Sequence, residues 1–203
     1  MDYNFSGDFK SIRDILDISQ KEFAKVLDTE QKTISNIESK DSYPSKTIVE
    51  SAFTYAFKKD VKINKLKELL CRDNLSHNEK LLFHGAKGEI KGDIDVNFSR
   101  GNNDFGKGFY TGESYEQAVS FISTYNDPSV YFICFDDNDL RCKKYTVDGE
   151  WMMTIAYYRG SLEEYENHPI IKKIIAESRD YDYIIAPIAD NKMFETINEF
   201  IEG

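Results

Sequence analysis

The sequence has few of the patterns that mark disulfide frameworks, metal centres or membrane spans. Its three cysteines, Cys71, Cys134 and Cys142, are odd in number and form no C-x-x-C pair, so neither a disulfide framework nor a zinc site is indicated. No apolar run approaches the roughly 20 residues that span a bilayer. The first residues also lack a basic region leading into an apolar stretch, as a secretion signal would have. We therefore expect reduced thiols and a soluble, cytoplasmic protein.

Several familiar catalytic motifs are missing as well. The sequence contains no Walker loop, no H-E-x-x-H, no G-x-S-x-G and no Rossmann glycine pattern. Gly106-Lys107-Gly108 is similar to a fragment of a phosphate loop, but no Ser or Thr follows the Lys and the spacing differs. There is no internal repeat and no low-complexity tract. The chemistry of this chain must therefore come from another arrangement of residues.

Charge is distributed unevenly along the 203 residues. Residues 1–75 hold 13 Lys and Arg against 13 Asp and Glu, whereas residues 76–203 hold 13 against 23, which accounts for the formal net charge of -10. An acidic surface repels polyanions over a Debye length of roughly 8–10 Å. This argues against broad nucleic-acid binding by the second part. The length and the 40% apolar composition suit two small domains.

The first seventy residues predict five helices. Phe9, Ile12, Ile15 and Leu16 recur at helical spacing, and Ser19 with Glu22 forms a capping box that opens a second helix. The apolar positions that we expect to face inward in the remaining helices are Phe23, Ala24 and Leu27, then Ile34 and Ile37, then the stretch 46–57, then Ile63, Leu66, Leu69 and Leu70.

The segment Ser19-Gln20-x-x-Phe23-Ala24-x-x-Leu27, followed by Thr33-Ile34-Ser35-x-Ile37-Glu38, resembles the repressor-type (Xre, lambda-repressor-like) helix-turn-helix. The resemblance covers about residues 8–70 and implies that the third helix enters the DNA major groove. It would place Gln20 at a phosphate. It would also place near bases or phosphates Gln31, Lys32, Ser35 and Asn36.

A second interpretation of this helical part involves no DNA. The same five helices can serve for dimerisation or for holding a protein partner, with a solvated face in place of a DNA-reading face. The balanced charge favours this interpretation, since non-specific DNA affinity comes mainly from Lys and Arg. Glu30, close to where the groove would be negative, favours it too.

From Lys80 onward the pattern changes to short apolar runs typical of strands, at Leu81–Phe83, Val130–Phe135 and Tyr183–Ala186. Between them lie helical stretches. Ser114 and Gln117 form a capping box that opens a helix, whose inward positions are Ala118, Phe121 and Ile122, and further helices are expected at Ile170–Glu177 and Lys192–Ile201. Strands and helices without βαβ regularity predict an α+β domain.

The most specific motif is a pair: Phe83-His84-Gly85, and about twenty residues later Asp104-Phe105-Gly106-Lys107-Gly108-Phe109-Tyr110. The pair resembles the H-Y-E branch of the ADP-ribosyltransferases. With Ser99-Arg100, Glu116-Gln117-Ala118 and the stretch 181–190, the match is narrower and resembles the bacterial DUF3990 family, placed in that superfamily. The resemblance runs from Lys80 to the chain end. It implies a split β-sheet transferase-like domain at residues 74–203, after a helix-turn-helix domain at residues 1–73.

The resemblance implies that the cofactor is NAD, and it assigns a role in NAD binding to several residues of this chain. His84 would hydrogen-bond a ribose hydroxyl, and Gly85 would offer its backbone to the nicotinamide amide. Tyr110, after Gly108, would stack on the nicotinamide ring. Arg100 would meet the pyrophosphate, and Phe121 is a candidate for the opposite face of the ring.

Each of these residues also has a structural interpretation. A His after a strand can be a half-buried side chain, one of 13 tyrosines can be core, Arg100 can form a surface ion pair and an aromatic such as Phe121 can be helix packing. His168, before a proline at a helix start, and the single Trp151 are interpreted as structural.

One departure from the family pattern concerns the third catalytic motif, usually Glu, on a late strand. This chain stops at Gly203, before that strand would be reached, so the last strand is expected to be missing. Asp182 and Asp190 are available acids, though the family pattern does not place the third residue there. Three explanations of the missing strand are open: the chain is naturally shortened, another chain supplies the strand, or an unfamiliar position of this chain supplies the acid. An open sheet edge would suit a protein partner.

Two functions follow. The first is an NAD-dependent ADP-ribosyltransferase that acts on a macromolecule, with a DNA- or partner-binding module, in a toxin–antitoxin or phage-conflict setting. The second is a catalytically inactive NAD-binding or partner-binding domain of a DNA-binding regulator, which the absent third motif favours. Whether the chain is an enzyme is thus left open, and no metal is expected.

Overall fold

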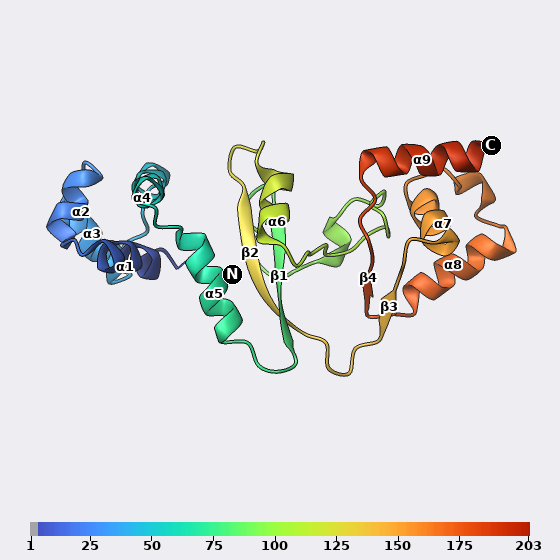
Figure 1. Ribbon diagram of the computed structural model, residues 1–203, viewed down its shortest axis with the longest axis horizontal. Helices are drawn as coiled ribbons and strands as arrows, with labels where there is room; N and C mark the ends of the chain where they lie inside the picture. Colours follow the sequence, from blue (N-terminus) through green and yellow to red (C-terminus); the bar gives the residue numbers. More distant parts are fainter. Residues whose placement is uncertain (1–3) are drawn as a thin grey trace. The chain divides into compact units, whose positions relative to one another are not determined.

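The computed structural model describes residues 4–203, which form two compact units, one ending at Ser76 and one beginning at His77 (Figure 1). All strands within the described residues lie in the second unit, which contains helices as well. The predicted α+β class is confirmed.

Unit 1, the residues up to Ser76, is helical, as its apolar periodicity predicted. The Ser19 capping box is present: Ser19 Oγ accepts from the Glu22 N–H at 3.2 Å, and Glu22 Oε2 accepts from the Ser19 N–H at 2.8 Å. The helices are α1 (Phe5–Leu16), α2 (Gln20–Val26), α3 (Gln31–Glu38), α4 (Lys46–Lys58) and α5 (Ile63–Asp73).

The core of unit 1 is built from most of the predicted positions. Phe9 and Phe23 meet edge to face at 5.7 Å, and both are fully buried, as are Ile12 and Ile34. The predicted inward positions of α5 are mostly wrong: Ile63 is buried, but Leu66, Leu69 and Leu70 are exposed. These leucines lie on a groove of about 260 Å³ along α1 and α5, lined by Asp8, Ser11, Ile15, Ile63, Leu66, Lys67, Leu69 and Leu70.

Unit 2 contains two small sheets. β1 (Glu79–Ala86) pairs antiparallel with β2 (Ser129–Asp136), with His84 opposite Tyr131 and Gly85 opposite Val130. β3 (Cys142–Lys144) pairs in parallel with β4 (Tyr183–Ile185). On its other edge β1 forms one bridge, between Phe83 and Gly112. Helix α6 (Tyr115–Ile122) packs on β1 (Figure 1).

The helices that follow β2 are α7 (Gly149–Tyr158), α8 (Pro169–Arg179) and α9 (Asn191–Glu202). These three helices and the residues packed with them in one core form the α7–α9 lobe. Two short 3₁₀ turns, Val96–Phe98 and Glu163–Tyr165, lie in the connections. The core of this α7–α9 lobe centres on Trp151, which is 1% exposed and whose Nε1–H donates to the Pro187 carbonyl at 3.2 Å. His168 caps α8. Both residues are therefore structural, as predicted.

None of the helices in residues 4–203 combines the length and the apolar character that a membrane crossing requires. Over the same residues, no cluster of three or more His, Cys, Asp or Glu side chains is arranged to hold a metal ion.

Candidate functional site

The two motifs of the sequence come together at the edge of β1. The glycine-rich segment 104–112, called the glycine loop below, ends where Gly112 bridges Phe83. The Phe83 N–H donates to the Gly112 carbonyl at 2.8 Å, and the Gly112 N–H donates back to the Phe83 carbonyl at 2.9 Å. This bridge brings His84 and Gly85 beside Tyr110, although about twenty-five residues separate them in sequence.

His84 is held by the glycine loop itself. Its Nδ1 lies 2.6 Å from the carbonyl oxygen of Tyr110, and its ring stacks on Phe109 with centroids 4.2 Å apart and an angle of 26° between planes. A carbonyl oxygen only accepts, so Nδ1 carries the proton and donates. In the tautomer that this bond selects, the acceptor is Nε2, and within residues 4–203 no hydrogen bond to Nε2 is formed. Phe109 as a stacking partner was not predicted.

Gly85 lies at a gap in the β ladder. Phe83 directs its N–H and C=O to Gly112, away from β2. Successive residues of an antiparallel strand direct these groups to alternate sides, so the N–H and C=O of Gly85, two residues later, also point away from β2. Its partner there would be Tyr110, but the carbonyl of Tyr110 accepts from His84 instead. Outside the β1–β2 ladder no backbone hydrogen bond reaches Gly85 among the described residues. One donor and one acceptor therefore face the gap.

Gly85 is also required by packing. A Cβ at this position would lie 2.5 Å from the backbone carbonyl oxygen of Ala118 and 3.0 Å from Ile122 Cγ2. No real Cβ approaches a backbone atom so closely. The glycine thus allows α6 to lie against β1, a role that the sequence prediction did not include.

Tyr110 bends back over its own loop. Its hydroxyl donates to the Gly106 carbonyl at 2.8 Å and accepts from the Phe105 N–H at 3.2 Å. Burial of the phenol raises the pKa of Tyr110 to about 12. Tyr110 as a whole residue remains 39% exposed, so the ring is fixed in position and still reachable. A Cβ at Gly108 would lie 3.5 Å from this ring, and the Gly108 N–H donates to Ser99 Oγ at 2.8 Å.

The start of the glycine loop is packed on the α7–α9 lobe. Gly106 adopts a positive φ of 74°, and a Cβ there would lie 2.8 Å from the Tyr158 ring. Tyr158 is held in turn by a 2.7 Å hydrogen bond between its hydroxyl and Ser178 Oγ. Asp104 pairs with Arg159 at 2.5 Å. Tyr158 and Arg159 were not found from the sequence, because no local pattern links them to a loop fifty residues earlier.

Arg100 and Phe121 are not brought into this cluster by any contact. Arg100 is exposed and forms no ion pair within residues 4–203. Phe121 is 63% exposed, so its predicted inward orientation is wrong. The buried face of α6 is made by Ala118 and Ile122, which are the residues that meet Gly85.

The two acids considered for the third catalytic position both have structural partners. Asp182 Oδ2 accepts from the Arg141 N–H at 2.8 Å, which ties the start of β4 to β3. Asp190 Oδ1 accepts from the Met193 N–H at 2.7 Å and caps α9. Neither carboxylate contacts His84 or Tyr110.

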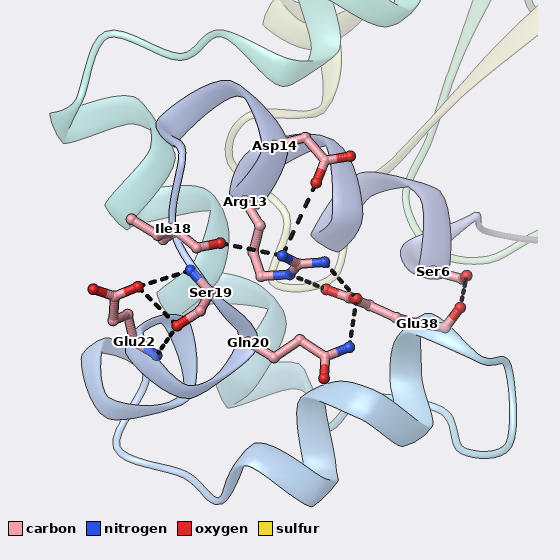
Figure 2. Close-up of polar contacts among 8 residues, drawn as sticks. All are labelled: Ser6, Arg13, Asp14, Ile18, Ser19, Gln20, Glu22 and Glu38. Carbon is pink, nitrogen blue, oxygen red and sulfur yellow. Dashed lines mark hydrogen bonds and ion pairs between the residues drawn. The ribbon is translucent and has the colours of Figure 1, made fainter.

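In unit 1, the predicted DNA-contacting residues fall on α2 and α3. Gln31 and Lys32 are exposed, while Ser35 and Asn36 are half-buried. Gln20 has a partner within unit 1: its Nε2 donates to Glu38 Oε2 at 2.9 Å (Figure 2). Arg13 donates to the same carboxylate at 2.6 and 2.8 Å. The sequence did not predict these hydrogen bonds to Glu38, which together connect α1, α2 and α3.

A family model matches residues 81–203, more than half of the chain, and its description is "Protein of unknown function (DUF3990)". No curated protein and no solved structure matches the chain.

Proposed function

The chain belongs to the DUF3990 family, and from this membership and the geometry around His84 we propose that unit 2 binds NAD and transfers its ADP-ribosyl group to a macromolecule. The observation that carries the proposal is the gap beside Gly85. There an unpaired backbone donor and acceptor, the imidazole of His84 and the ring of Tyr110 lie on adjoining residues of β1 and the glycine loop.

These groups fit the nicotinamide end of NAD. A carboxamide has one acceptor oxygen and an NH₂ donor, which complement the N–H and C=O of Gly85. The Tyr110 ring, held at its hydroxyl by Gly106 and Phe105, offers a flat face for stacking. His84 Nε2 would accept from a ribose hydroxyl, because Nδ1 already donates to Tyr110. Arg100 would meet the pyrophosphate.

The residues of this site would contribute binding and orientation to the transfer. Nicotinamide would be the leaving group: the bond from C1′ to the ring nitrogen would break, its electron pair would leave with nicotinamide, and an acceptor nucleophile would bond C1′ and release its proton to solvent. The glycine loop and His84 would orient the donor and keep the ribose in place. The acidic excess of residues 76–203 disfavours polyanionic acceptors, which makes a protein the favoured one.

The experiment is transfer of label from NAD to the proteins of a cell lysate, with His84→Asn and His168→Asn as matched variants. Asn at residue 84 can still donate to the Tyr110 carbonyl but lacks the Nε2 acceptor, and Asn at residue 168 remains a good helix cap. We expect labelling by the wild type and by His168→Asn and strongly reduced labelling by His84→Asn. Equal labelling by all three proteins would contradict the assignment of His84.

A second function is favoured by the structural bonds of Asp182 and Asp190, which leave the third catalytic position unassigned. In this case unit 2 would bind NAD without transferring its ADP-ribosyl group and would act as a sensor for unit 1. Calorimetric binding of NAD with no label transfer and no NAD hydrolysis would support it.

For unit 1 we propose a helix-turn-helix that binds DNA through α3. The support is the exposure of Gln31 and Lys32 on α3 and the hydrogen-bonded connection of α1, α2 and α3 through Glu38, which fixes how α3 is presented (Figure 2). A gel-shift experiment at low salt tests this proposal: the protein should specifically retard the promoter DNA upstream of its own gene.

A further inference from the structure

Arg159, the residue that follows α7, connects the glycine loop to the segment before α9. Its Nε and Nη2 lie 2.7 and 2.5 Å from Asp104 Oδ1, and Nη2 also donates to the Ala189 carbonyl at 2.6 Å. Asp104 Oδ2 accepts from the Ala189 N–H at 3.2 Å. The three residues therefore form a closed set of bonds in which each contacts the other two.

This ion pair differs from those on the surface of the unit. The side chains of Arg159 and Asp104 are only 18% and 15% exposed, whereas those of Arg141 and Asp182 are 67% and 41% exposed. Salt and water screen a shielded pair less than an open one. The guanidinium also lies over the Phe194 ring of α9, with 4.6 Å from Cζ to the centroid, so its position is fixed from a second side.

The two ends of the glycine loop contact different parts of unit 2. At the start, Asp104 bonds Arg159, Phe105 packs on Tyr145 with centroids 5.1 Å apart, and Gly106 lies on Tyr158. At the end, the loop contacts β1 through the His84 and Phe83 bonds described above. The direction in which Tyr110 faces therefore depends on both attachments.

We propose that Arg159 is a positioning residue for the NAD site: by binding Asp104 and Ala189 together, it holds the start of the glycine loop on the α7–α9 lobe and so keeps Tyr110 beside His84. Arg159 does not itself contact the ligand. The NAD part of this role rests on the proposed function, whereas the holding of the loop does not.

The holding of the loop can be measured without NAD, because Lys107 is exposed within the loop and is a trypsin site. The rates of cleavage at Lys107 and at the exposed Lys172 of α8 are compared in Arg159→Ala, Asp104→Asn and Arg141→Ala. We expect cleavage at Lys107 to be faster by about tenfold in the first two, with Lys172 unchanged, because a shielded charged hydrogen bond is lost and the loop opens locally. Arg141→Ala should behave as the wild type.

Unchanged cleavage at Lys107 in Arg159→Ala would overturn the proposal, and so would an equal rise at Lys107 and Lys172, which would mean general unfolding. Arg159→Lys should lie between the wild type and Arg159→Ala, since an ammonium keeps the charge without the planar fork that bonds both partners.

Calorimetric titration with NAD then tests the positioning role. We expect the dissociation constant of Arg159→Ala to rise by about tenfold and that of Arg141→Ala to stay unchanged. Unchanged NAD affinity in a variant whose loop has opened would overturn the positioning role. No NAD binding by the wild type would overturn the proposed function and the NAD role with it, while the trypsin rates would still decide whether Arg159 holds the loop.

Discussion

Gly85 shows how one residue serves both the fold and the proposed site. The absence of a side chain lets the Ala118 carbonyl of α6 approach β1, and the same position turns its own N–H and C=O toward the gap left by Tyr110. A larger residue would disturb both. Its structural role can be tested whether or not NAD binds.

Gly85→Ala should destabilise unit 2 by about 1–3 kcal/mol, because the new methyl group would overlap a backbone atom that cannot move alone. Urea unfolding followed by the fluorescence of Trp151, which is buried in unit 2, measures the free energy of unfolding. Gly88→Ala is the matched control, since its nearest atom lies 3.9 Å from the added Cβ. Equal stability of the two variants would show that α6 does not approach β1 this closely.

Tyr110 gives a prediction on alkaline pH. Its pKa of about 12 in the folded chain lies above the ordinary 10.0, so the unfolded state loses the proton first. The stability that this group contributes is complete below pH 10 and is lost as pH rises toward 12. Tyr110→Phe should therefore lose stability less steeply than the wild type over this range, as followed by urea unfolding. Parallel curves would mean that the hydroxyl is not shielded.

At the scale of elements, Glu38 joins three helices of unit 1. Arg13 of α1 and Gln20 of α2 both donate to this carboxylate at the end of α3, and its side chain is 8% exposed (Figure 2). Burial alone would raise the pKa of Glu38, but the hydrogen bonds from Arg13 and Gln20 outweigh it, so the pKa is lowered. Its contribution to stability is present above the ordinary pKa of 4.5 and is lost as pH falls through the folded value.

Glu38→Gln should reduce the free energy of unfolding of unit 1 by about 2 kcal/mol at neutral pH, the size of a charged hydrogen bond lost from a shielded site. The difference from the wild type should shrink as pH falls below 4.5, because the wild-type carboxylate then becomes protonated too. Urea unfolding followed by helical circular dichroism measures it. Asp14→Asn is the control, as Asp14 is exposed and 4.0 Å from Arg13. A difference that is independent of pH would contradict the assigned charge pair.

Short-range sequence patterns predicted most of the helices and strands, and the prediction failed where an element depends on packing between distant residues or lacks a clear period. The capping box at Ser19 and the periodicity of unit 1 are short-range patterns, and the structure contains them. Helix α7 was not predicted, because its residues are apolar on nearly all sides and so show no clear helical period. Phe121 was predicted inward because an aromatic residue usually packs. In this helix the close approach of Ala118 to Gly85 leaves Phe121 outside.

The proximity of three candidate site residues agrees with the sequence prediction, whereas their role stays a prediction. The sequence pointed to His84, Gly85 and Tyr110, and the structure places them beside each other. The glycine loop's attachments to Tyr158 and Arg159 could not be predicted, because they depend on how the α7–α9 lobe packs, and no sequence spacing encodes that.

At the scale of the molecule, the uneven charge separates the two proposed activities. Unit 1 carries equal numbers of positive and negative side chains, so it would contact DNA through few cations. The loss of any one of these cations should therefore weaken DNA binding measurably. Lys32→Ala on α3 should weaken retardation of promoter DNA by about tenfold and reduce its salt dependence by about one phosphate contact. Lys58→Ala, an exposed lysine at the end of α4, is the matched control. Equal effects of the two changes would mean that α3 does not read the groove.

The central proposal is that the gap between His84 and the glycine loop holds NAD, and calorimetric titration of the whole chain with NAD tests it most directly. We expect one NAD to bind per chain, with affinity weakened about tenfold or more in His84→Asn, which loses a single acceptor, and unchanged in His168→Asn. No heat of binding at millimolar NAD, or equal affinity in His84→Asn and the wild type, would contradict it.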